Sequence, residues 1–175
     1  MNSIFRIVGK IVDWFEVLVL SLGVFLLAAL LIANVIARNF FRSIYYAEEV
    51  SMILVIFITF VGLSYAVRKA RHIRMGAIFD ALNPKWQKIM LFIIAGYSAF
   101  FMFLMAYYAY EYVVTARLTM QVTSSLRIPY WIIVVIVVIG FFSAGIQYIR
   151  TIIKNIIEKD VWLSPEQQSE YEAEG

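Results

Sequence analysis

The stretch from Val17 to Ala37, VLVLSLGVFLLAALLIANVIA, contains 21 successive residues without Asp, Glu, Lys, Arg or His. Three more such runs, of 18, 22 and 22 residues, follow it at 50–67, 89–110 and 128–149. As helices rising about 1.5 Å per residue they would reach roughly 27 to 33 Å, which matches a hydrocarbon core of about 30 Å. The sequence therefore predicts an all-α fold, an integral membrane four-helix bundle.

The composition supports one membrane domain. Hydrophobic residues make up 63% of the chain, and the mean hydropathy is +0.82. Both values lie above those of a soluble domain. We expect a four-span domain over residues 1–163 and a polar cytoplasmic tail over 164–175. Asp13 and Glu16 precede the first apolar run, which lacks a small-residue cleavage site, so this segment is interpreted as a retained helix. The absence of Cys excludes disulfides and thiolate metal sites.

The distribution of basic residues predicts the orientation. Eleven Lys and Arg residues fall in the two termini and the loop between the second and third runs, and four fall in the other two loops. Because basic loops stay in the cytoplasm, both termini are predicted to be cytoplasmic. The middle loop dominates the count and is a candidate for membrane-surface anchoring. Its basic residues are Arg68, Lys69, Arg71, Arg74, Lys85 and Lys88.

Two short amphipathic segments are predicted to lie in the membrane interface. In the first, apolar residues recur at helical spacing between Ile4 and Phe15, with Arg6 and Lys10 on the opposite side. In the second, an apolar stripe over 75–82 ends at Asn83-Pro84, which is a reasonable helix terminator. Both segments could be simple membrane anchors or docking sites for a partner.

The spans lack the groups that membrane chemistry needs. Ion-coupled transporters usually place ionisable residues or broken helices near the bilayer midplane. The charge-free runs have no such residue, and Pro84, Pro129 and Pro165 all lie outside mid-span positions. The only histidine, His72, is in the basic loop, so intramembrane haem ligands are missing. We therefore expect no enzyme activity, no cofactor, no metal site and no nucleic-acid partner.

A polar cluster is predicted at the turn between the first two spans. Asn34, Arg38 and Arg42 recur every four residues, and so share one helix face if the first helix continues. Glu48 and Glu49 open the second span, where carboxylates favour the positive end of the helix dipole. The five residues could form an internal clasp across the turn, through pairing of the carboxylates with the arginines, or an interface for a second protein.

Several motifs together resemble a known family. They are N-V-I-A-R at 34–38, the E-E pair at 48–49, F-V-G-L-S-Y-A-V-R-K at 60–69, R-H-I-R-M-G-A-I-F-D at 71–80 and S-L-R-I-P-Y-W at 125–131. In this order, and with four spans, the chain between about Trp14 and Arg150 is similar to the small membrane subunit of tripartite ATP-independent periplasmic (TRAP) transporters.

The resemblance implies a multi-pass protein of the bacterial inner membrane with two protein partners. One is a large multi-span permease subunit that carries the substrate and Na⁺ sites, and the other is a periplasmic substrate-binding protein. The small subunit would act as a scaffold, surrounded by membrane lipid, for Na⁺-coupled uptake of an organic anion such as sialic acid or a C4-dicarboxylate. The alternative is a homo-oligomeric channel or exporter. Its pore would be lined by Asn34, Thr59, Ser64 and Gln147.

Overall fold

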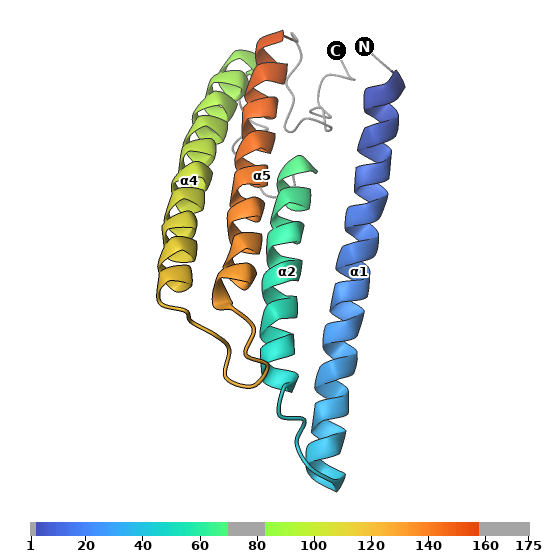
Figure 1. The fold of residues 1–175 in the computed structure, drawn as a ribbon. Coiled ribbons are helices and arrows are strands. Elements are labelled where there is room, and N and C mark those ends of the chain that lie inside the picture. The colour runs from blue at the N-terminus through green and yellow to red at the C-terminus, as the bar shows by residue number, and fades with distance from the viewer. Residues whose placement is uncertain (1–2, 70–82, 158–175) are drawn as a thin grey trace. The chain divides into compact units, whose positions relative to one another are not determined.

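A computed structural model of the chain describes residues 3–69 and 83–157. These residues contain four long helices (Figure 1): α1 (Ser3–Phe40), α2 (Ala47–Arg68), α4 (Pro84–Leu118) and α5 (Tyr130–Ile157). Each helix is long and apolar enough to cross a membrane. The predicted all-α fold, with four membrane-spanning helices forming a bundle, is confirmed.

The helices extend beyond the charge-free runs. α1 has 38 residues and includes the N-terminal amphipathic segment, which is thus continuous with the first span. α5 continues past Arg150 and Lys154 to Ile157. A charged residue ends a hydrophobic run but not the backbone hydrogen bonding of a helix, and long basic side chains can reach the interface from within it. The second amphipathic segment, 75–82, and the tail, 164–175, lie outside the described residues.

The chain divides into two compact units. The first unit comprises Met1–Gly62 and Ala109–Val137, and the second comprises Leu63–Tyr108 and Val138–Gly175. The first unit therefore contains α1, the first part of α2, the end of α4 and the start of α5, together with the α1–α2 turn (residues 41–46) and the α4–α5 loop (residues 119–129).

In the first unit α1 runs beside α2 (Figure 1), and Gly23 of α1 packs closely on α2. A Cβ atom added to Gly23 would come within 2.9 Å of Ile58 Cγ1, and one added to Gly62 would lie 3.6 Å from Leu20 Cδ2. Small residues promote membrane helix association because they let backbones approach closely. Only 6% of the residues in the apolar stretch of α1 are buried, so most of the surface of this stretch is available to lipid or to other proteins.

The second unit has a core of small and aromatic residues. Ala95, Ala99, Ala144, Tyr148 and Val67 form one buried cluster. Gly145 packs directly on the Phe103 ring, since an added Cβ would lie 2.9 Å from Cζ of that ring. The core thus depends on close helix approach at positions without bulky side chains.

Candidate functional site

The α1–α2 turn is closed by a side chain of α1. The carboxamide oxygen of Asn34 accepts hydrogen bonds from the backbone N–H of Ile44, at 3.0 Å, and from Ser43 Oγ, at 3.4 Å. The Ala47 N–H donates to the Ile44 carbonyl at 3.0 Å, at the beginning of α2. Asn34 therefore satisfies backbone and hydroxyl groups that a short turn would otherwise leave without partners.

Glu49 connects the start of α2 to the α4–α5 loop. Its two carboxylate oxygens accept hydrogen bonds from successive backbone N–H groups, those of Ser125 and of Leu126, the latter at 2.9 Å. Ser125 Oγ also donates to the Tyr45 carbonyl at 3.2 Å. Glu48 is exposed, and its backbone carbonyl accepts a hydrogen bond from Ser51 Oγ at 2.9 Å. The adjacent carboxylates thus have different surroundings, and only Glu49 holds a distant segment.

The α4–α5 loop has an ordered backbone. Val122 and Pro129 form an antiparallel bridge, and the Thr123 N–H donates to the Ile128 carbonyl at 3.0 Å. The hydroxyl of Thr123 accepts from the Ile128 N–H at 3.0 Å. Met120 and Arg127 have φ angles of 49° and 53°, in the left-handed region that allows the chain to turn sharply. These bonds fix the position in which Ser125 and Leu126 meet Glu49.

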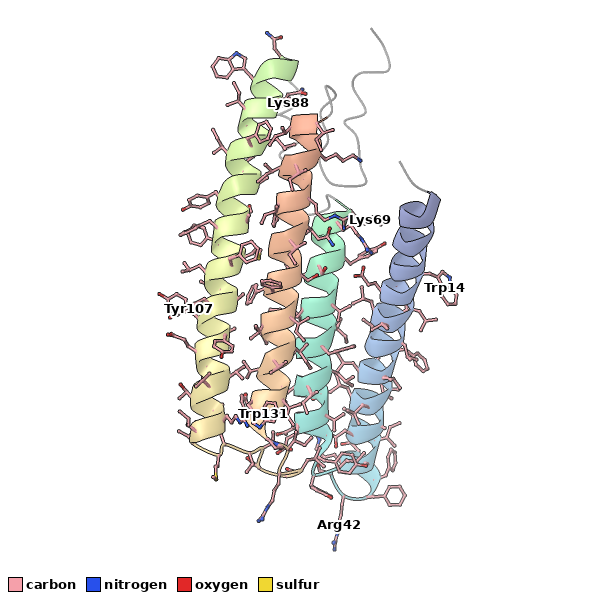
Figure 2. All side chains as sticks on the ribbon, turned by 45° about the horizontal axis from the view of Figure 1, so that its top comes forward. Trp14, Arg42, Lys69, Lys88, Tyr107 and Trp131 are labelled. Atoms are coloured by element: carbon pink, nitrogen blue, oxygen red, sulfur yellow. The ribbon has the colours of Figure 1, made fainter. Side chains whose placement is uncertain are left out.

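The two arginines of the predicted cluster are exposed and do not pair with its carboxylates. Within the described parts of the chain, neither Arg38 nor Arg42 forms an ion pair with Glu48 or Glu49, and Arg42 points away from the helices (Figure 2). The turn is held by Asn34, not by an ion pair. Whether the cluster also contacts a second protein stays a prediction.

Sequence reasoning did not find Ser125 and Leu126 as the contacts of Glu49. Their contribution comes from backbone N–H groups 76 and 77 residues away from it. Side-chain identity carries no signal of such a backbone bond. The S-L-R-I-P-Y-W motif, which contains both residues, is the only sequence signal that singled out this segment.

The basic segment is described only in part. Arg68 is 5% exposed, and its guanidinium carbon lies 5.9 Å from the Tyr65 ring centroid. Lys69 and Lys88 are half-buried and are labelled in Figure 2. Arg71, Arg74 and the side chain of Lys85 lie outside the described residues. A role of this segment in membrane-surface anchoring therefore stays a prediction.

Polar groups of the second unit are paired locally. Ser64 Oγ and Ser143 Oγ lie 2.7 Å apart in a hydrogen bond. Thr151 Oγ1 donates to the Gln147 carbonyl at 3.0 Å, and Asn155 Nδ2 donates to the Thr151 carbonyl at 2.9 Å. Gln147 Oε1 accepts from Arg150 Nη1 at 3.3 Å. Ser64 and Gln147, suggested above as pore-lining residues, thus already have protein partners.

Four long apolar helices, with their connecting segments held by Asn34 and Glu49, are the features of a multi-pass membrane protein. Among the described residues, no cluster of three or more His, Cys, Asp or Glu could hold a metal ion.

Comparison with known proteins identifies the family. Residues 27–158 match the family model described as tripartite ATP-independent periplasmic transporters, DctQ component. The chain is also 38% identical over 165 residues to the ectoine TRAP transporter small permease protein TeaB of Halomonas elongata, an alignment that covers 94% of this chain and 86% of that protein. The chain therefore belongs to the DctQ family of TRAP transporter small subunits, as its motifs indicated.

Membership in this family has three direct consequences. The chain is a transporter subunit and not an enzyme. It is a multi-pass protein of the inner membrane. The family implies a large permease subunit and a periplasmic binding protein as its partners.

Proposed function

We propose that this chain is the scaffold on which the large permease subunit is held while that subunit carries solute across the membrane. The observation that supports this most strongly is that each span contains 18 to 22 successive residues without Asp, Glu, Lys, Arg or His. An anion crossing hydrocarbon without a compensating group faces a cost of several kcal/mol or more. The partner must therefore supply the transport site, and this chain supplies apolar surface.

The exposure of α1 is consistent with a scaffold. Large apolar side chains on this helix remain accessible along its length, with Phe25 68% exposed and Ile32 61% exposed. Apolar side chains here would face lipid in the isolated chain and a second membrane protein in the assembled transporter.

Copurification with the large subunit tests this directly: we expect the two to elute as one complex. Elution of the chain as a homo-oligomer alone would instead support the channel alternative.

We propose both termini to be cytoplasmic, on the strength of the basic-residue count. A cysteine introduced at Ser43, in the exposed α1–α2 turn, should react with a membrane-impermeant thiol reagent added from the periplasm. A cysteine at Gly76, in the basic loop, should stay protected until the membrane is permeabilised. Because the chain has no Cys, each variant carries a single reactive thiol. The opposite labelling pattern would reverse the orientation.

We propose a small organic solute as the substrate and an Na⁺ gradient as the energy source. The sequence comparison gives no support to sialic acid or a C4-dicarboxylate, the two classes expected above, because the relative is named for ectoine. Ectoine is therefore the first solute to test. Proteoliposomes containing this chain, its large subunit and its binding protein should accumulate the correct radiolabelled solute only with an inward Na⁺ gradient. Uptake that is independent of Na⁺ would refute the coupling.

A further inference from the structure

The α4–α5 loop lies level with aromatic residues of the α1–α2 turn. Ser125 Oγ contacts the Tyr45 carbonyl, and the Ser125 and Leu126 N–H groups bind Glu49. Tyr45 is 72% exposed, and Phe41, in the same turn, is 85% exposed. Tyr and Trp residues next to a membrane span concentrate at the membrane–water interface. On this basis the loop is expected at the depth of the lipid headgroups.

The side chains at this loop include several exposed apolar ones. An aqueous connection between two spans would be expected to expose mainly polar groups, whereas partial immersion in the headgroup region favours apolar groups. The exposed apolar residues, on the loop or directly beside it, are Leu118 at 78%, Met120 at 84%, Val122 at 53% and Leu126 at 38%.

Beyond Glu111, the end of α4, the loop and α5 contain only positive charges, and the carboxylate at the loop, that of Glu49, comes from α2. No acidic residue occurs between Glu111 and Ile157, and no lysine occurs between Lys88 and Lys154. The cations at the loop are Arg117 and Arg127, both exposed. The Arg117 guanidinium carbon lies 5.9 Å from the centroid of the Trp131 ring. A guanidinium group binds phosphate oxygens through two parallel N–H donors, which an ammonium group cannot do.

We propose that the α4–α5 loop is a lipid-binding surface, in which the exposed apolar side chains enter the headgroup region and Arg117 and Arg127 bind phospholipid phosphates. Glu49 is the positioning residue of this surface, because its carboxylate holds the loop backbone. The proposal does not depend on the transported solute or on the coupling ion. It adds a lipid contact to the scaffold role and assigns it to particular residues.

Spin labelling tests the immersion of the loop. A nitroxide on the single-cysteine variant Val122→Cys should collide more with lipid-soluble oxygen than with a water-soluble nickel chelate, in nanodiscs of phosphatidylethanolamine and phosphatidylglycerol. Phe25→Cys, on a residue 68% exposed in α1, gives the hydrocarbon reference. The Val122 label should lie between this reference and water. Greater accessibility to the nickel chelate than to oxygen would overturn the proposal.

Native mass spectrometry tests the arginines. The double variant Arg117→Gln/Arg127→Gln should retain fewer phosphatidylglycerol molecules than the parent chain, and fewer than Arg38→Gln/Arg42→Gln, which removes the same charge at and beside the exposed α1–α2 turn. Equal losses in both variants would indicate a general charge effect and overturn the assignment.

Repeating the spin-label measurement in the complex with the large permease subunit distinguishes lipid from protein as the occupant. Oxygen accessibility at Val122 should persist in the complex. Its loss there would mean that the large subunit covers the loop, and this result would also contradict the proposal.

Discussion

The two units of this protein are stabilised in different ways although both are built from apolar helices. In the first unit, Asn34 and Glu49 bind backbone groups of segments that connect the helices. In the second unit, Gly145, Ala144 and their neighbours allow helices to pack closely. Lipid is as apolar as the helix surfaces, so burial of apolar area drives membrane helices together only weakly. Polar contacts and close packing supply the remainder: Gly23 packs as closely in the first unit as Gly145 does in the second. In the first unit Asn34 and Glu49 add contacts to the connecting segments.

The largest expected effect comes from filling the close contact in the second unit. Gly145→Ala would place a Cβ atom 2.9 Å from the Phe103 ring, so the ring or helix must move. Overpacking of this kind typically costs about 1–3 kcal/mol. Gly96→Ala is the matched control, because nothing lies within 4 Å of its added Cβ. It should be neutral or stabilising by up to about 1 kcal/mol, since Ala favours helices over Gly. Thermal unfolding in detergent measures both, and equal melting temperatures would contradict the packing argument.

The second-largest effect is expected at Glu49, and it distinguishes the role of this carboxylate from that of its neighbour Glu48. Glu49→Gln removes the charge that strengthens the bonds from Ser125 and Leu126, whereas Glu48→Gln changes an exposed neighbour. Hydrogen exchange at the Ser125 and Leu126 amides should accelerate several-fold in the first variant and stay at the parental rate in the second. Equal acceleration in both variants would show that helix-dipole charge matters more than the loop contact.

A smaller effect is expected at the α1–α2 turn. Asn34→Ala deletes the acceptor of the Ile44 N–H, and the loss of one such hydrogen bond costs about 1 kcal/mol. Asn39→Ala, at an exposed position of the same helix, is the control and should leave stability unchanged. The free energy of unfolding in a denaturing detergent titration compares the two. Equal stability of both variants would mean that Asn34 does not hold the turn.

The smallest effect concerns the hydroxyl pair of the second unit. Hydrogen bonds between membrane helices contribute about 0.6 kcal/mol on average in double-mutant cycles. Ser64→Ala, Ser143→Ala and the double variant form such a cycle around the 2.7 Å contact. We expect a coupling energy of this size. Strict additivity would show that the contact between the two hydroxyl groups contributes no stability.

Much of the fold follows from the sequence because one physical constraint dominates it. A bilayer requires runs of apolar residues of fixed length, and these runs stand out between charged segments. The ends of the helices were harder to predict. Arg150 and Lys154 end the last charge-free run, yet α5 continues past both. Helix continuation depends on backbone hydrogen bonds, which charge alone does not interrupt.

The candidate site was predicted less completely than the fold. Asn34 and Glu49 were both placed in the predicted cluster, but Glu49 was expected to pair with Arg38 or Arg42, and no partner was predicted for Asn34. The structure gives both of them backbone donors instead, in the α1–α2 turn and the α4–α5 loop. Which backbone donors a side chain meets depends on tertiary geometry, and for Glu49 that geometry joins segments more than 70 residues apart.

Reconstitution of transport tests the scaffold role most directly. Proteoliposomes with the large permease subunit and the solute-loaded binding protein should take up little or no solute without this chain, and should regain uptake when it is added. This chain alone should show no uptake of solute under an inward Na⁺ gradient. Saturable, Na⁺-dependent uptake by the purified chain alone would contradict the account, because its charge-free runs would then have to contain a transport site.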